Sequence, residues 1–228
     1  MREALEAAGC AVIERNPGDA ETLPAAGEIA GVVTLGGRQS ATRLAEDPFL
    51  TAEVELLHEA LEQHVPVLGM CLGAQLLAVA AAGRVSYTGA MNAGWPEMTL
   101  LPAAAGDLLF GAFPERLPVL KWHEDIIEIP SGATELATTP GPGTALFRVG
   151  ESAWGSQAHL ELTAPMLIEG WTVDPGDVAE IEGAGHRIED FRAQSRDHLV
   201  AQMAAARPMF TAFGRLATAT SCPSSSAA

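Results

Sequence analysis

A cysteine lies where a buried strand is expected to turn into a helix. Cys71 follows the apolar run Val65–Met70, and glycines at 69 and 73 flank it in the pattern G-x-C-x-G. Such glycines permit a tight, strained strand-to-helix turn that exposes the cysteine at the carboxyl edge of a sheet. The positive end of the helix favours the thiolate, which is the nucleophilic form. The pattern predicts a reactive cysteine; a structural cysteine in a glycine-rich turn is the alternative.

A histidine and a glutamate two residues apart form a second candidate group. His159 and Glu161 follow the expected strand Ala153–Ala158. In an extended backbone both side chains would point to the same face. A carboxylate on one imidazole nitrogen fixes the tautomer, while the other nitrogen is free to face a thiol. The pair predicts a base and its orienting group; a surface histidine beside a solvated glutamate is the alternative.

Two glycines close the apolar segment Ile29–Leu35. Gly36 and Gly37 would let backbone N–H groups approach a tetrahedral oxyanion closely, and the N–H of Leu72 is a second candidate donor. An ordinary turn between a strand and a helix is the alternative.

Four segments occur in a fixed order along residues 2–172: Leu35-Gly-Gly, G-M-C-L-G-A-Q around Cys71, W-H-E-D from Trp122, and Q-A-H-L-E around His159. Together they resemble a class I glutamine amidotransferase domain, of the stand-alone type similar to the amidotransferase half of GMP synthase, a group that includes peptidases of the C26 type. The resemblance implies that Cys71, His159 and Glu161 form a triad. Such a triad removes ammonia from the side-chain amide of glutamine without a metal or an organic cofactor.

The resemblance also implies the roles of four further residues. Gly37 and Leu72 are the expected oxyanion donors. Gln75, one helical turn beyond the cysteine, is an expected substrate contact. Asp125, the last residue of W-H-E-D, is expected to receive the α-ammonium group of the substrate.

Three positions depart from the family pattern. Leu160 replaces the proline of His-Pro-Glu, Arg38 replaces the proline after the glycine pair, and Glu124 replaces the glycine of W-H-G-D. These departures keep two alternatives to a glutaminase open. One is a γ-glutamyl peptidase or hydrolase that acts on glutathione-like conjugates. The other is a catalytically silent binding or regulatory subunit.

The expected fold class is α/β, with a mostly parallel, open, flavodoxin-like sheet and flanking helices. Residues 1–220 are expected to form one domain, followed by a disordered tail over 221–228. The family's usual first strand is not found, which leaves two alternatives: the true start lies upstream, or the sheet lacks a strand and exposes an edge for a partner to cover. The expected helices are Arg2–Gly9, Phe49–His64, Leu72–Ala82 and Ile188–Ala206, the last limited by Pro208. The expected strands are Cys10–Ile13, Ile29–Leu35, Val65–Met70, Met98–Leu101, Leu117–Leu120, Ile126–Ile129, Ala145–Val149 and Ala153–Ala158.

Composition narrows the partners. The 13 Lys and Arg residues stand against 29 Asp and Glu residues, a formal net charge of -16. Such a surface repels phosphate backbones and anionic lipids, so nucleic acid and membrane are not expected as partners.

The uncharged segment Val65–Gly83 is expected to be a buried strand and helix rather than a membrane span. The amino terminus lacks a signal-type apolar region, so a cytoplasmic location is expected. The expected partners are a γ-glutamyl substrate and a separate synthetase that accepts ammonia.

Overall fold

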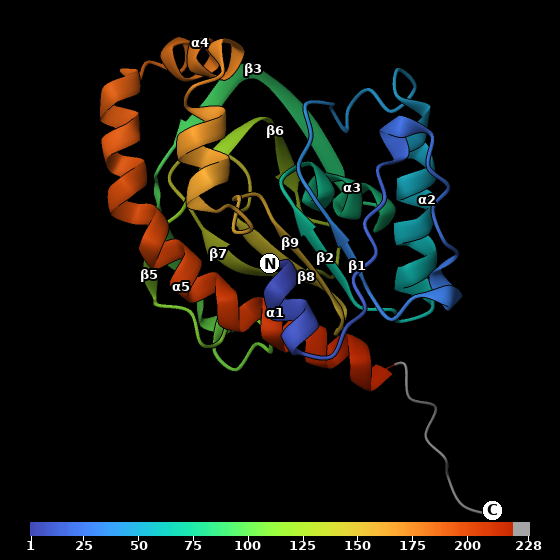
Figure 1. Ribbon diagram of the computed structural model, residues 1–228. Helices are drawn as coiled ribbons and strands as arrows, with labels where there is room; N and C mark the ends of the chain where they lie inside the picture. The colour runs from blue at the N-terminus through green and yellow to red at the C-terminus, as the bar shows by residue number, and fades with distance from the viewer. Residues whose placement is uncertain (221–228) are drawn as a thin grey trace, which may run out of the picture.

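The computed structural model describes residues 1–220, so the tail expected over 221–228 lies outside the described residues. The described residues form a seven-stranded sheet in the order β1-β2-β9-β8-β7-β4-β5 and a two-stranded ribbon of β3 and β6. Figure 1 shows these strands with helices around them. The strands are β1 (Val32–Thr34), β2 (Val67–Met70), β3 (Arg84–Gly94), β4 (Glu97–Leu100), β5 (Arg116–Pro118), β6 (Lys121–Glu128), β7 (Thr134–Thr138), β8 (Leu146–Val149) and β9 (Ala153–Ser156). The helices are α1 (Arg2–Ala7), α2 (Pro48–Glu62), α3 (Leu72–Ala80), α4 (Pro175–Gly183), α5 (Ile188–Thr220) and the π-helix η4 (Pro165–Trp171). Short 3-10 turns lie at Pro17–Asp19, Ala26–Glu28 and Pro102–Ala104.

The α/β class with an open sheet and flanking helices is confirmed, and the sheet is mixed. Strands β1, β2 and β9 run parallel, whereas β8, β7, β4 and β5 are antiparallel to their neighbours. Strand β1 pairs with β2 and lies at one edge of the sheet. Because β1, β2 and β9 are parallel, their carboxyl ends meet at the same edge, and the loops that follow them lie together.

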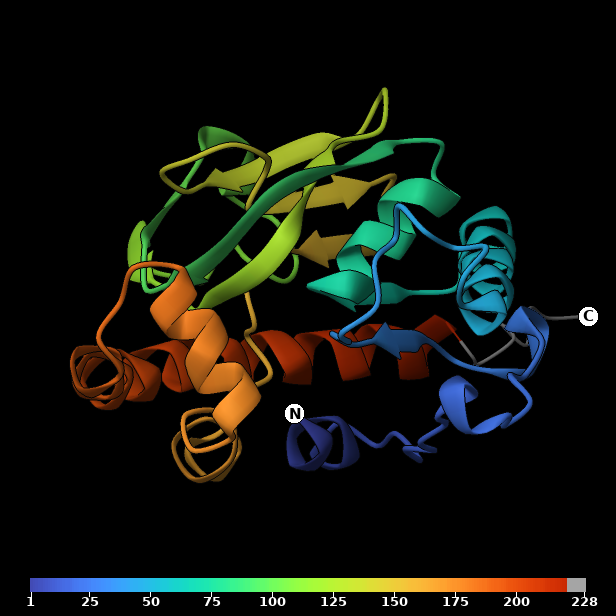
Figure 2. The ribbon, with the colours of Figure 1, turned by 90° about the horizontal axis from the view of Figure 1, so that it is seen from above.

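Helices cover both faces of the sheet. Figure 2 shows α1 and α5 on one side, and α2 and α3 on the other. The alternation of side chains in β2 divides the two cores: Leu68 and Met70 pack with Phe210 and Phe213 of α5, while Val67 packs with residues of α2 and α3. A third apolar cluster joins the β3–β6 ribbon to η4, α4 and the start of α5.

The uncharged segment Val65–Gly83 is core, as expected. All four residues of β2 are buried, and so are eight of the nine residues of α3. Among residues 1–220, no helix is both long and apolar enough to cross a bilayer.

Several expected elements are wrong or misplaced. Cys10–Ile13 is not a strand: nothing in the described part of the chain pairs with it, and Ile13 is 71% exposed. Strands β3 and β7 are additional to the expected set, because their sequences lack clear apolar alternation. The last helix does not stop near Pro208 but continues to Thr220. A proline inside a helix costs about 3 kcal/mol, and here buried side chains on α5 offset that cost; they include Ala206, Met209, Phe210 and Phe213.

The chain contains one lysine, and it is buried. Lys121 begins β6, is 1% exposed, and donates from Nζ to Thr139 Oγ1 at 2.8 Å. No carboxylate pairs with it among residues 1–220. Burial lowers the pKa of Lys121 to about 8.

This depressed pKa predicts a pH dependence of stability. Between about pH 8 and 10.5 the unfolded chain binds the lysine proton and the folded chain does not, so stability rises with pH. Below that window both states are protonated and the penalty is constant. Lys121→Met should therefore raise the free energy of unfolding at pH 7 by up to about 3 kcal/mol. It should also flatten the rise above pH 8. Urea unfolding at a series of pH values measures both; parallel curves for variant and wild type would contradict the prediction.

Candidate active site

Cys71 occupies a strained backbone conformation. It is the residue before α3, with φ 50 and ψ -109, a region that residues other than glycine rarely adopt. Two hydrogen bonds hold the turn: the Cys71 N–H donates to Ser156 O at 2.7 Å, and the Gly73 N–H donates to Leu35 O at 3.1 Å. The residue after β1 and the end of β9 thus fix the turn from both sides. Strain of this kind clusters at functional sites.

The flanking glycines are required by contact between backbones. A Cβ on Gly69 would lie 2.6 Å from Gly73 O, and a Cβ on Gly73 would lie 2.3 Å from Thr34 O. Backbone atoms cannot move away as a side-chain end can, so only glycine fits at either position. The G-x-C-x-G pattern therefore follows from the close approach of β1, β2 and α3.

The Cys71 sulfur is enclosed by three groups. In its thiol form the S–H donates to Trp122 O at 3.6 Å, and Gln157 Nε2 donates toward Sγ at 3.9 Å. The His159 ring lies near enough to the sulfur for the two groups to interact electrostatically. Gly36 lies against both residues, since a Cβ there would be 2.8 Å from His159 Cε1 and 3.5 Å from Cys71 Cβ.

Glu161 holds the other side of the histidine ring. His159 Nδ1 and Glu161 Oε1 are 2.7 Å apart, and both side chains are buried. Burial lowers the pKa of His159, but the Cys71 sulfur and the Glu161 carboxylate outweigh it, and the pKa lies well above its ordinary value. The imidazolium is therefore the favoured form in the neutral range.

The route by which the two side chains meet differs from expectation. Strand β9 ends at Ser156, so His159 and Glu161 stand in a turn rather than in extended backbone. Leu160, which replaces the family's proline, is 1% exposed and belongs to the main core. Apolar packing at Leu160 anchors the turn between the two functional side chains.

Two tryptophans form a wall beside the histidine. The Trp171 ring meets the His159 ring edge-on with centroids 5.0 Å apart, and Trp122 meets Trp171 in the same manner at 5.3 Å. Sequence reasoning did not identify Trp171, because no motif surrounds it; only its residue type could have drawn attention.

All seven residues predicted for the site line one cavity of about 350 Å³. They are Cys71, His159, Glu161, Gly37, Leu72, Gln75 and Asp125. As the first residue of α3, Leu72 has an N–H without an acceptor inside the helix. Gly37 lies beside it, since a Cβ on Gly37 would be 3.0 Å from Leu72 Cδ2.

Asp125 is buried at the cavity, within strand β6. Its Oδ2 accepts a hydrogen bond from Ser40 Oγ at 2.5 Å, and within residues 1–220 its Oδ1 has no hydrogen-bond partner. Gln75 Nε2 donates to the Asp125 backbone oxygen at 3.3 Å. The carboxylate therefore retains capacity for a further donor.

Across the described chain, no three His, Cys, Asp or Glu side chains gather as a metal site needs.

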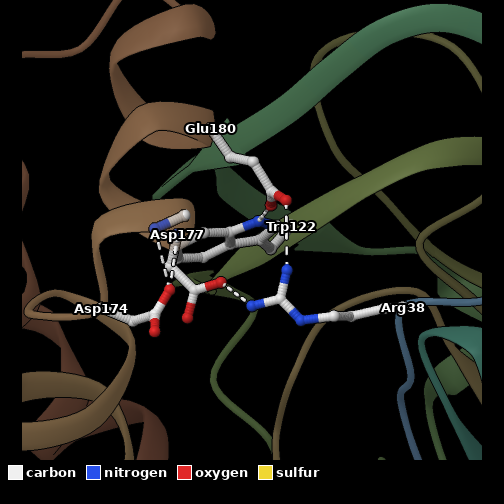
Figure 3. Close-up of polar contacts among 6 residues, drawn as sticks. Arg38, Trp122, Asp174, Asp177 and Glu180 are labelled. Carbon is white, nitrogen blue, oxygen red and sulfur yellow. Dashed lines mark hydrogen bonds and ion pairs between the residues drawn. The ribbon is translucent and has the colours of Figure 1, made fainter.

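An ion-pair network spans the cavity rim (Figure 3). Arg38 pairs with Asp177 and, at 3.4 Å, with Glu180, both on α4. Trp122 Nε1 donates to Glu180 Oε2 at 2.8 Å, and Asp174 caps α4 by accepting from the Asp177 N–H at 3.1 Å. We call Arg38, Asp177 and Glu180 the rim clasp. Burial raises the pKa of Asp177, and Arg38 opposes that rise.

Gly36 and Gly37 offer a matched test of this geometry. Gly36→Ala would drive a methyl group into the His159 ring, whereas the contacts of Gly37→Ala are the ends of two flexible side chains, Gln39 and Leu72. Displacing the ring should slow alkylation of Cys71 by iodoacetamide at pH 7 about 10-fold or more in Gly36→Ala. Gly37→Ala should lose less, as measured by mass spectrometry of the Cys71 peptide. The reverse order would show that the ring does not stand where the structure places it.

The rim clasp predicts a difference between two arginines. Arg38→Met leaves the Asp177 carboxylate, whose side chain is 12% exposed, without its cation. We expect a loss of about 1 kcal/mol in unfolding free energy at low salt, shrinking as salt is added. Arg43 forms an ion pair with the exposed Glu46 at 3.7 Å, so Arg43→Met should change little. Equal effects in urea unfolding would count against a structural role for the clasp.

Comparison with known proteins places this geometry in a family. The family described as glutamine amidotransferase class-I matches residues 2–165. A glutamine amidotransferase-like protein of Salmonella typhimurium, YfeJ, is 32% identical over 143 residues, which cover 61% of this chain and 60% of that protein. GMP synthase [glutamine-hydrolyzing] of Streptomyces avermitilis is 33% identical over 146 residues, covering 62% of this chain and 26% of the synthase. The chain thus spans less than two thirds of these relatives' length.

Two solved structures share the fold of this chain. A glutamine amidotransferase from Thermotoga maritima superposes with a TM-score of 0.80 at 25% identity, covering 93% of this chain and 90% of that one. A glutamine amidotransferase from Methylobacillus flagellatus shares the fold with a TM-score of 0.77 at 24% identity, covering 93% of this chain and 87% of that one. The chain belongs to the class I glutamine amidotransferase family.

Proposed function

We propose that this chain hydrolyses the side-chain amide of glutamine and supplies the ammonia to a separate acceptor enzyme. One observation carries the proposal: a cysteine in a strained strand-to-helix turn lies against a histidine whose far nitrogen is 2.7 Å from a buried glutamate. This is the order of nucleophile, base and orienting group that acyl transfer requires. Membership of the amidotransferase family supports the same chemistry.

In the first half-reaction the Cys71 thiolate attacks the γ-carboxamide carbon of the substrate. The resulting oxyanion is stabilised by the backbone N–H groups of Gly37 and Leu72, which line the same cavity. The His159 imidazolium donates its proton to the departing nitrogen. Ammonia leaves, and a γ-glutamyl thioester remains on the sulfur.

In the second half-reaction His159, now neutral, removes a proton from water as the water attacks the thioester carbonyl. The tetrahedral intermediate collapses, the sulfur leaves as thiolate, and glutamate is released. The Glu161 carboxylate keeps the ring oriented throughout and stabilises its charged form.

Asp125 is the proposed receptor for the substrate's α-ammonium group. Its Oδ1 has no hydrogen-bond partner within residues 1–220, and an ammonium group supplies both the donor and the counter-charge. Gln75 acts next to it by holding the Asp125 backbone, and it lines the cavity as a further contact.

An ammonia acceptor on another chain is part of the proposal. A relative from Haloarcula marismortui, whose name describes it as one subunit of GMP synthase [glutamine-hydrolyzing], is 34% identical over 106 residues, which cover 46% of this chain and 55% of that protein. A synthase that is divided into subunits supports an arrangement in which the amidotransferase and the synthetase are separate chains.

A second candidate, hydrolysis of γ-glutamyl conjugates, is favoured by the size of the cavity. At about 350 Å³ it is in the range that holds drug-sized molecules, and so it offers space beyond the glutamine side chain. Both reactions share the γ-glutamyl thioester and differ in the leaving group.

A diazoketone analogue of glutamine tests the proposal. We expect a single adduct on the Cys71 peptide by mass spectrometry, and none in Cys71→Ala. Free glutamine should compete with labelling. An analogue lacking the α-amino group should label poorly in the wild type, and Asp125→Asn should abolish the difference between the two analogues. Labelling elsewhere, or none, would contradict a cysteine amidase.

The leaving group separates the two reactions. Ammonia released from glutamine, measured beside amine released from γ-glutamyl peptides on the same enzyme, identifies the preferred substrate. A Cys71→Ala protein that retains full biological activity would instead support a silent regulatory role.

A further inference from the structure

Helix α5 contributes one amide to the segment that carries the histidine. Gln202 is 0% exposed. Its Oε1 accepts from the Leu120 N–H at 2.8 Å, and its Nε2 donates to His159 O at 2.8 Å. The His159 N–H in turn donates to Leu120 O at 2.9 Å. The three hydrogen bonds close a ring that contains Gln202, Leu120 and the histidine backbone.

This ring of hydrogen bonds connects the backbone of His159 to the strand that contacts the Cys71 sulfur. Leu120 directly precedes β6, and Trp122 of that strand accepts the hydrogen bond from the Cys71 thiol. The ring therefore fixes the His159 backbone relative to the strand that touches the sulfur. Within residues 1–220 no strand pairing does this, because β9 ends at Ser156.

The apolar surroundings of Gln202 indicate that it does more than fill space in the core, because burying an amide there costs free energy. Its neighbours on the inner face of α5, Leu199 and Ala206, are buried in apolar clusters. A leucine would fill such a place without the cost of burying an amide. The amide is tolerated because both its groups are bonded, and both bonds go to backbone atoms beside the site.

We propose that Gln202 is a positioning residue that sets the His159 ring at its working place beside Cys71. It acts from a helix that lies after residue 165, where the family match ends. The expected effect on catalysis rests on the proposed function, whereas the placement of the His159 imidazole does not.

Two variants and one control test it. Gln202→Leu removes both bonds. Gln202→Glu keeps the acceptor for the Leu120 N–H but, when ionised, repels His159 O; when protonated it can donate again. Ser195→Ala is the matched control, because Ser195 is also on α5 and also 0% exposed. Its hydroxyl accepts a hydrogen bond from Trp95 Nε1 at 3.0 Å and makes none to His159.

The readout is alkylation of Cys71 by iodoacetamide across pH, followed on the Cys71 peptide, together with kcat and KM for glutamine and thermal unfolding. We expect Gln202→Leu to slow alkylation near pH 6 and to lower kcat by about 10- to 100-fold, with KM changed little. Gln202→Glu should recover toward wild type as pH falls and its carboxyl protonates. Ser195→Ala should lose stability but keep both rates.

Three results would count against these proposals. If Gln202→Leu and Ser195→Ala lose stability alike and both keep wild-type alkylation and kcat, Gln202 positions nothing. If Gln202→Leu does not fold, the pH profile of Gln202→Glu decides: a profile parallel to wild type overturns the proposal. A wild type without glutaminase activity would refute the proposed function, while the alkylation profiles would still test the placement of His159.

Discussion

The site depends on a contact between backbones. Thr34 at the end of β1, Gly69 in β2 and Gly73 in α3 approach so closely that no Cβ fits at either glycine. This contact brings the start of α3 against two parallel strands. Cys71, midway between the two glycines, has a positive φ in this turn. The sulfur is thereby carried to the carboxyl edge of the sheet, where the loops after β1 and β9 also arrive.

Placing a thiol there is not sufficient, because the groups around it must favour charge in a buried site. Burial opposes an imidazolium, and only the sulfur and the Glu161 carboxylate close to the His159 ring reverse that effect. Low local polarity also strengthens each of these interactions. Segments after residue 165 complete the enclosure: Trp171 packs against the ring, α4 closes the rim, and Gln202 holds the turn. The part that matches the family contributes Cys71, His159 and Glu161 to the cavity, and the part beyond it adds Met166, Trp171, Asp177 and Glu180 to the lining.

The sequence predicted the elements whose signals are local. The β2–α3 turn could be predicted because apolar runs and flanking glycines coincide at Cys71, and all seven predicted site residues line one cavity. The features that could not be predicted depend on distant partners. The rim clasp joins residues 38 and 177, and the Gln202 ring joins residues 120, 159 and 202, with no motif marking either. Strand β3 lacks an apolar pattern because it forms a two-stranded ribbon with β6, and most of its residues are not buried. Packing likewise carried α5 past Pro208 against a local signal.

The protonation state of His159 is the most informative quantity to measure, because the proposed action of Cys71 as a nucleophile needs the ring beside it in the charged form. Nitrogen-15 NMR of labelled histidines, with His159 assigned by a His159→Gln variant, reports that state across pH. We expect an imidazolium that persists well above pH 6.5 in the wild type and titrates at lower pH in Cys71→Ser. A ring that titrates near pH 6.5 in both proteins would contradict it.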